Sequence, residues 1–232
     1  MRTAYVAGVP IGQSTLGDLL WYLVWDMRIV SPILGPLTVA LVNAFSLVES
    51  DRNPKHKAAL TDALCLADGI GVALLARTPK IAGADLMLAA ARHPRLGRMR
   101  HVLLGGFGVA YRAALRQWKE VGADVLVKMP WIPDTNLTDL VALANHTPCD
   151  ILWVALGCPK QEIWMYENRD RLKAKVVIAV GAAFDMLAGR TPRAPAWMRL
   201  IGLEWAWRIH QEPRRWRRQV DAAVGFLRLL CR

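Results

Sequence analysis

Carboxylates set in glycine-bounded turns are the first candidates for chemistry in this chain. Asp68 lies in the turn Ala67-Asp68-Gly69, where it can act as a general base toward a hydroxyl group or serve as a turn residue. Asp85 and Asp185 stand at expected helix starts, where a carboxylate is favourable as a cap alone. Spacing by itself therefore does not decide whether each of these acids has a functional role or a local structural one.

Two glycine turns are suited to contact with phosphate. Gly105 and Gly106 separate an expected strand from an expected helix, so backbone amides can meet a ligand there, although a tight turn needs the same glycines. The segment 157–162, GCPKQE, is more specific, because its glycine–proline turn places a lysine and a glutamine at a helix start. A capped helix with Lys160 in solvent is the alternative. The full GxGxxG spacing of a dinucleotide site is missing, which argues against an oxidoreductase.

Residues 190–232 form a local cationic segment. They hold ten Arg, no Lys and three acids, and so supply +7 of the net charge of +11. Arg favours planar, bidentate recognition of phosphate, and four of the ten Trp also lie here, as at a membrane interface. A solvated helix face or a nonspecific polyanion patch would explain the charge more simply. A pI of about 10.0 keeps a basic nucleic-acid-binding α/β protein open as the alternative function.

The order of these turns predicts the architecture. Strand, glycine turn and helix alternate, which builds a parallel sheet with helices on both faces and ligands outside the carboxyl ends of the strands. We predict an α/β fold, with a Rossmann-like catalytic domain over residues 1–189 and an Arg/Trp-rich helical appendage that associates with a membrane over 190–232. The expected strands are 38–42, 101–104, 124–128, 150–156 and 175–180, and the expected helices are 15–28, 54–66, and others starting near 109, 160, 182 and 213.

Composition excludes several classes of protein. With 54% hydrophobic and 21% charged residues among 232, the chain can bury a sizeable core and is not globally disordered. Its four Cys are scattered without a CxxC pair, which predicts neither a zinc site nor a disulfide framework. The uncharged segment 29–48 is long enough to cross a bilayer, but Pro32 and Pro36 favour a loop, a strand and a helix start instead.

Taken in order, these motifs resemble the WecG/TagA/CpsF family of bacterial glycosyltransferases. The resemblance covers most of the chain, from about residue 39 to residue 218, and the strings are specific together although each is weak singly. The matching strings are 43–44, 67–71, 83–86, 103–106, 155–162, 180–185, 189–190, 193–195 and 202–213. Leu41 and Lys80 depart from the pattern, since family members often carry Thr and Arg there, and this puts the identity of the donor sugar in doubt.

The resemblance implies an inverting hexosyltransferase that moves a sugar from a UDP-sugar to a polyprenyl-diphosphate-linked saccharide in envelope or exopolysaccharide assembly. It implies a peripheral protein on the anionic surface of the inner membrane, at its cytoplasmic face, without cofactor, metal or specific nucleic acid. The oligomeric state stays open, a homo-oligomer included. By motif position, Asp68 is the expected catalytic base. The expected donor-binding residues are Asn43, Lys80, Asp85, Gly105, Gly106, Gly157, Pro159, Lys160, Gln161 and Asp185, and the expected acceptor- and diphosphate-binding residues are Arg208, Arg215 and Arg218.

Overall fold

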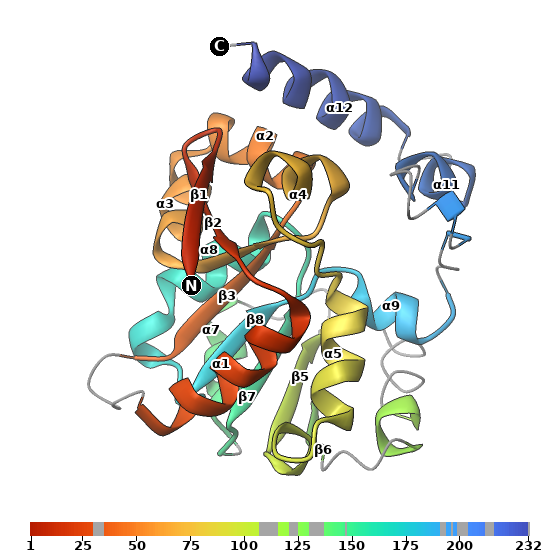
Figure 1. Ribbon diagram of the computed structural model, residues 1–232. Coiled ribbons are helices and arrows are strands. Elements are labelled where there is room, and N and C mark those ends of the chain that lie inside the picture. The colour runs from red at the N-terminus through yellow and green to blue at the C-terminus, as the bar shows by residue number, and fades with distance from the viewer. Residues whose placement is uncertain are drawn as a thin grey trace.

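One mostly parallel sheet organises the chain. The computed structural model describes residues 1–29, 35–106, 116–120, 125–129, 137–146, 148–190, 194–195, 197–198, 204–211 and 216–231. Within them lies an eight-stranded sheet in the order β1-β2-β4-β3-β8-β7-β5-β6, parallel except for β1 at the edge (Figure 1). The strands are β1 (Arg2–Val6), β2 (Val9–Gln13), β3 (Leu37–Val42), β4 (Leu64–Ala67), β5 (His101–Gly105), β6 (Val125–Met129), β7 (Ile151–Ala155) and β8 (Val176–Ala179). The predicted α/β fold is confirmed.

Helices cover both faces of this sheet (Figure 1). They include α1 (Leu16–Ile29), α2 (Ala44–Arg52), α3 (Pro54–Asp62), α4 (Ile70–Ala76), α5 (Gly83–Arg92), α7 (Leu137–Asn145), α8 (Lys160–Glu167), α9 (Ala183–Leu187), α11 (Glu204–Gln211) and α12 (Trp216–Leu230), with 3-10 turns η1 (Leu96–Arg98) and η2 (Arg169–Arg171). Side chains of α1, α5 and α9 pack with Val39 and Leu41 of β3. Side chains of α2 and α3 pack with Ala40 and Val42 on the opposite face. Because strand side chains alternate, the apolar run of β3 fills both cores.

Three strands, β1, β2 and β4, were not anticipated. The helix expected over 54–66 ends at Asp62, and Leu64–Ala67 forms β4 between β2 and β3, because a four-residue apolar run does not by itself distinguish strand from helix. The N-terminal hairpin β1–β2 turns at Ala7 and Gly8, both with positive φ, which suits a tight hairpin turn without the usual Asn-Gly signal. The prediction was therefore wrong for residues 64–66 and silent on the hairpin.

The uncharged segment 29–48 is divided between elements of the globular core. It contains the end of α1, all of β3 and the start of α2, as the interpretation of a loop, a strand and a helix start predicted, while residues 30–34 lie outside the described part. Among the described helices, none combines the length and the apolar composition needed to span a bilayer. The expected helix start near residue 109 also lies outside the described residues, while residues 116–120 are helical.

Candidate active site

The turns that carry the candidate residues meet along one edge of the sheet. In the parallel register, Val42 of β3 faces Ala67 of β4, and Gly105 of β5 faces Ala155 of β7. β8 joins the two halves between β3 and β7, so the carboxyl ends of these five strands form one rim (Figure 1). Asn43, Asp68 and Gly106 directly follow β3, β4 and β5, and Gly181 is the second residue after β8. Such a rim is where ligands bind in open parallel sheets.

Asn43 and the Asp68 turn lie side by side on this rim. Asn43 caps α2, with its side-chain oxygen accepting a hydrogen bond from the Ser46 amide at 3.2 Å. The amide of Asp68 donates to the Val42 carbonyl at 2.8 Å, which continues the β3–β4 ladder into the turn. A Cβ placed on Gly69 would lie 3.3 Å from the Asn43 Cβ. The fold thus brings the expected base next to the first expected donor-binding residue.

Gln161 joins two rim turns through its side-chain amide. It is 3% exposed, its oxygen accepts from the Gly181 amide at 3.1 Å, and its nitrogen donates to Glu162 Oε1 at 2.7 Å. Both ends of the amide are therefore engaged, and the turn after β8 is held against the start of α8. This geometry makes Gln161 a positioning group for the rim, and its expected contact with the donor stays a prediction.

Asp85 and Asp185 lie in the first turns of two helices that pack together at the rim. α5 begins at Gly83, where an added Cβ would lie 3.0 Å from the Val180 carbonyl oxygen and 3.4 Å from the Ala183 Cβ. Glycine at this position lets α5 approach the start of α9 closely without displacing the Val180 carbonyl. Both carboxylates are partly exposed, as a ligand-binding role requires.

The glycine turn after β5 belongs to the same region. Gly105 has a φ of +99°, and an added Cβ would lie 2.5 Å from the Ala155 carbonyl oxygen, so this position requires glycine. At Gly106 the nearest side chain is Phe184, which precedes Asp185 in α9. The turn 157–160 after β7 lies across from it, with Lys160 exposed at the start of α8.

The C-terminal helices contact the rim from outside the sheet. Arg218 of α12 donates to the Cys158 carbonyl at 3.3 Å, and its guanidinium carbon lies 3.8 Å from the centre of the Phe45 ring. Lys80 pairs with Glu204 of α11. The lysine expected to bind donor is therefore engaged by the C-terminal segment. Arg208 lies on α11, but its side chain is outside the described part, as is all of Arg215.

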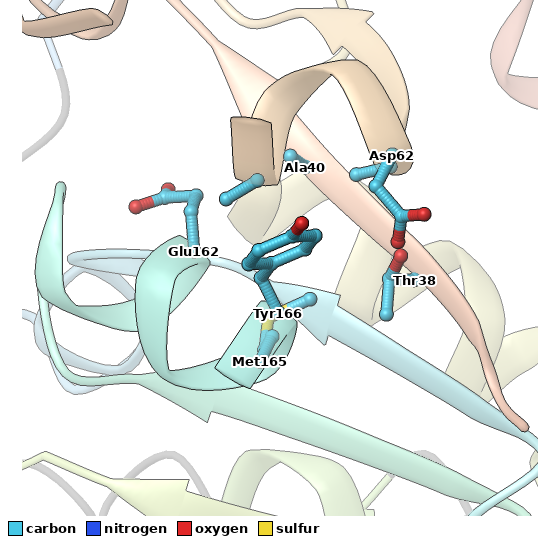
Figure 2. Close-up of a pocket in the computed structure, with 8 residues that line it drawn as sticks. Thr38, Ala40, Asp62, Glu162, Met165 and Tyr166 are labelled. Atoms are coloured by element: carbon cyan, nitrogen blue, oxygen red, sulfur yellow. The ribbon is translucent and has the colours of Figure 1, made fainter. Parts of the chain in front are cut away.

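A small pocket lies away from this rim, between β3, α3 and α8 (Figure 2). Its cavity volume is about 10 Å³, room for roughly one water molecule, whereas typical small-molecule sites have roughly 300–1,000 Å³. Its lining residues are Thr38, Ala40, Ala59, Asp62, Ala63, Glu162, Met165 and Tyr166. The pocket is too small for a nucleotide sugar, so the rim is the better candidate for the active site.

Three residues near the rim, Phe45, His56 and Glu204, were not predicted from the sequence to belong to the site. Glu204 lies within the string 202–213, and Phe45 directly follows the string 43–44. No local sequence pattern predicts that Phe45 contacts Arg218 or that Glu204 pairs with Lys80. His56 lies in α3 and approaches Cys158 and Glu162 of the GCPKQE segment. No spacing signal could have found it, because 102 residues separate His56 from Cys158.

The chain is similar in sequence to known glycosyltransferases. The profile described as "Glycosyl transferase WecG/TagA/CpsF family" matches residues 5–232, which include the C-terminal helices. An "N-acetylglucosaminyldiphosphoundecaprenol N-acetyl-beta-D-mannosaminyltransferase" of Bacillus subtilis (strain 168) is 28% identical over 234 residues, covering 95% of this chain and 88% of the relative. The protein of the same name from Bacillus spizizenii is 29% identical over 185 residues, covering 75% of this chain and 70% of the relative.

Proposed function

Because the chain belongs to the WecG/TagA/CpsF family of glycosyltransferases, we propose that it transfers a hexose from a UDP-sugar to a polyprenyl-diphosphate-linked saccharide. The names of the two relatives support an N-acetylmannosamine-type sugar and an N-acetylglucosaminyl-diphosphoundecaprenol acceptor as the first pair to test. One observation carries the proposal: Asn43, Asp68, Asp85, Gln161 and Asp185, which are remote in sequence, lie along a single rim. The product would enter the synthesis of a cell-envelope polymer.

In the proposed reaction, the acceptor hydroxyl attacks the anomeric carbon of the donor while Asp68 takes its proton. The bond between that carbon and the UDP oxygen breaks, UDP leaves with the electron pair, and the sugar inverts its anomeric configuration. Turn amides after β5 and β7, together with arginines of the C-terminal segment, would stabilise the charge that develops on UDP. No metal ion takes part in this step.

Helix α12 supports attachment to a membrane. Its face toward the core buries Ala222 and Phe226, whereas Trp216, Leu227 and Leu230 are exposed by 49%, 63% and 45%. Exposed apolar side chains on a helix in an Arg-rich segment suit the interface of an anionic bilayer. These side chains support our proposal of a peripheral protein, which we assign to the cytoplasmic face of the inner membrane because the proposed acceptor is lipid-linked.

Asp68→Asn tests the mechanism directly. A general base contributes roughly 10²–10⁴-fold, so turnover should fall by that factor while UDP affinity, measured by calorimetry, persists. Asp170→Asn is the matched control, because this exposed carboxylate lies in η2 after α8, away from the rim. Turnover is measured by mass spectrometry with several UDP-sugars and a synthetic lipid-diphosphate acceptor.

Two results would count against the proposal. Wild-type turnover in Asp68→Asn would remove Asp68 from the mechanism and leave the transferase assignment intact. Absence of affinity for any UDP compound, together with oligonucleotide binding that weakens steeply with salt, would favour a nucleic-acid-binding protein instead.

A further inference from the structure

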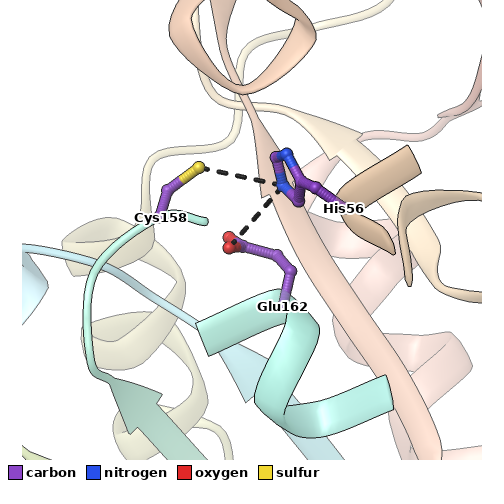
Figure 3. Close-up of side chains that lie close together, drawn as sticks. All are labelled: His56, Cys158 and Glu162. Atoms are coloured by element: carbon purple, nitrogen blue, oxygen red, sulfur yellow. Dashed lines mark hydrogen bonds and ion pairs between the residues drawn. The ribbon is translucent and has the colours of Figure 1, made fainter. Parts of the chain in front are cut away.

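Three potential metal ligands from separate elements converge beside the rim. His56 comes from α3, Cys158 from the turn after β7, and Glu162 from the first turn of α8 (Figure 3). His56 Nε2 lies 3.8 Å from Glu162 Oε2 and 3.9 Å from Cys158 Sγ, and the three ligand atoms all lie within 4.8 Å of one another. His56 and Glu162 are 0% and 3% exposed. The cluster is thus assembled by the tertiary fold and is largely shielded from water.

Two buried polar atoms of this cluster have no hydrogen-bond partner among the described residues. Within the described residues, Glu162 Oε2 and His56 Nδ1 are buried without a hydrogen-bond partner, although Glu162 Oε1 accepts from Gln161. An unpaired buried carboxylate is costly. The described side chains therefore leave Glu162 Oε2 without the partner that a buried carboxylate oxygen needs.

We propose that His56, Cys158 and Glu162 bind a divalent cation of the zinc class. Thiolate, imidazole and carboxylate are the three ligand types that Zn²⁺ takes in proteins. With Zn–S of about 2.3 Å and Zn–N or Zn–O of about 2.1 Å, neighbouring ligands of a tetrahedral ion lie roughly 3.3–3.6 Å apart. The 3.8 Å and 3.9 Å separations from His56 need to close by a few tenths of an ångström. The separation between Cys158 and Glu162, which is within 4.8 Å, needs to close by at most about 1.2 Å.

The charge balance favours such an ion. A divalent cation bound to one thiolate, one carboxylate and a neutral imidazole gives a site with no net charge, which suits a buried position. It would also give Glu162 Oε2 the partner that it lacks. The remaining tetrahedral position is left for a water molecule.

The bound cation would fasten the turn after β7 to α3. Glu162 is adjacent to Gln161, whose side chain holds the Gly181 turn, so the ion would fix two of the rim turns through one short chain of contacts. This role is structural and takes no part in the transfer step. The metal-site proposal does not depend on the proposed function, because metal binding and sugar transfer are measured in separate experiments.

The competing interpretation is a metal-free network, in which Glu162 is protonated and the Cys158 thiol donates to Ser46, 3.6 Å away. Burial raises the pKa of both Glu162 and Cys158, as this network requires. The two interpretations differ in one measurable respect, which is whether Cys158 coordinates an added divalent ion.

The test uses the full chain, stripped of metal and titrated with Co²⁺ as a spectroscopic probe and with Zn²⁺. We expect one ion per chain and a thiolate-to-cobalt charge-transfer band that Zn²⁺ abolishes. Cys158→Ser should lose the band, whereas Cys149→Ala and Cys231→Ser should keep it, because these thiols lie outside the cluster. Zn²⁺ at about 100 times its Kd should raise the Tm by roughly 5–10 °C.

A wild-type protein that binds neither ion stoichiometrically would overturn the proposal, and so would a charge-transfer band that survives Cys158→Ser. If Cys158→Ser does not fold, Glu162→Gln and His56→Gln replace it. A wild-type affinity for Zn²⁺ in both of these variants would be equally decisive against the site.

Discussion

Phe226→Ala tests how α12 is held on the core. Phe226 is 9% exposed and belongs to the core cluster that includes Val48 and Val72. Its ring fits over Gly71 so closely that a Cβ on that glycine would lie 2.9 Å from Phe226 Cε1. Among the described residues of α12, Ala222 is the other side chain buried to this degree. The phenyl ring should therefore provide most of the apolar attachment of the helix.

The expected size of the effect follows from this burial. Deleting a buried Phe side chain costs about 3–5 kcal/mol, and the lower end applies to a ring at the margin of the core. A loss of about 3 kcal/mol lowers the docking equilibrium constant roughly 100-fold, because each 1.4 kcal/mol corresponds to a factor of ten. The contacts of Arg218 with Phe45 and Cys158 remain and keep the helix near the rim.

Hydrogen exchange of the α12 amides measures this equilibrium, since exchange from a locally opened helix reports the opening free energy. We expect Phe226→Ala to exchange roughly 100-fold faster in α12, with β3 and β7 unchanged. Leu227→Ala is the control on the same helix: its side chain is 63% exposed, so exchange should stay as in the wild type. Protection of α12 in Phe226→Ala within a few-fold of wild type would refute the docking argument, as would equal losses in both variants.

Two further predictions concern the stability of the sheet and its turns. Burial raises the Asp150 pKa, but hydrogen bonds from Arg100 and Lys175 outweigh it and lower that pKa to about 2. Above pH 4, Asp150→Asn should lower the free energy of unfolding by about 1 kcal/mol, after allowance for solvent screening. This difference from the wild type should vanish as the pH falls toward 2, where Asp150 becomes protonated in the folded protein. Urea unfolding across that pH range measures the difference, and a difference that does not change with pH would contradict the prediction. Gly105→Ala should lower the Tm much more than Gly157→Ala, although both glycines have a positive φ. A Cβ added at Gly105 would lie 2.5 Å from the Ala155 carbonyl oxygen, whereas a Cβ added at Gly157 would meet no atom within 4 Å. Equal shifts in thermal unfolding would show that the Gly105 turn relaxes freely.

The sheet and its rim could be predicted because their signals are local. Strand, glycine turn and helix follow one another within a few residues around Gly157 and Gly181. These two turns and the Gly105 turn each lie at the carboxyl end of a strand in the structure. The predictions failed where a local pattern was ambiguous. Leu64–Ala67 is an apolar run too short to show a period, and its place between β2 and β3 decides that it is a strand.

By itself, the sequence determined the class of fold, the identity of the rim turns and the cationic character of the C-terminal segment, because propensity, turn chemistry and charge act over a few neighbouring residues. Only the tertiary structure decided which distant side chains meet. Lys80 pairs with Glu204 across 124 residues, and His56 approaches Cys158 across 102. Such contacts depend on how helices pack on the two faces of the sheet, and no spacing along the chain encodes that packing.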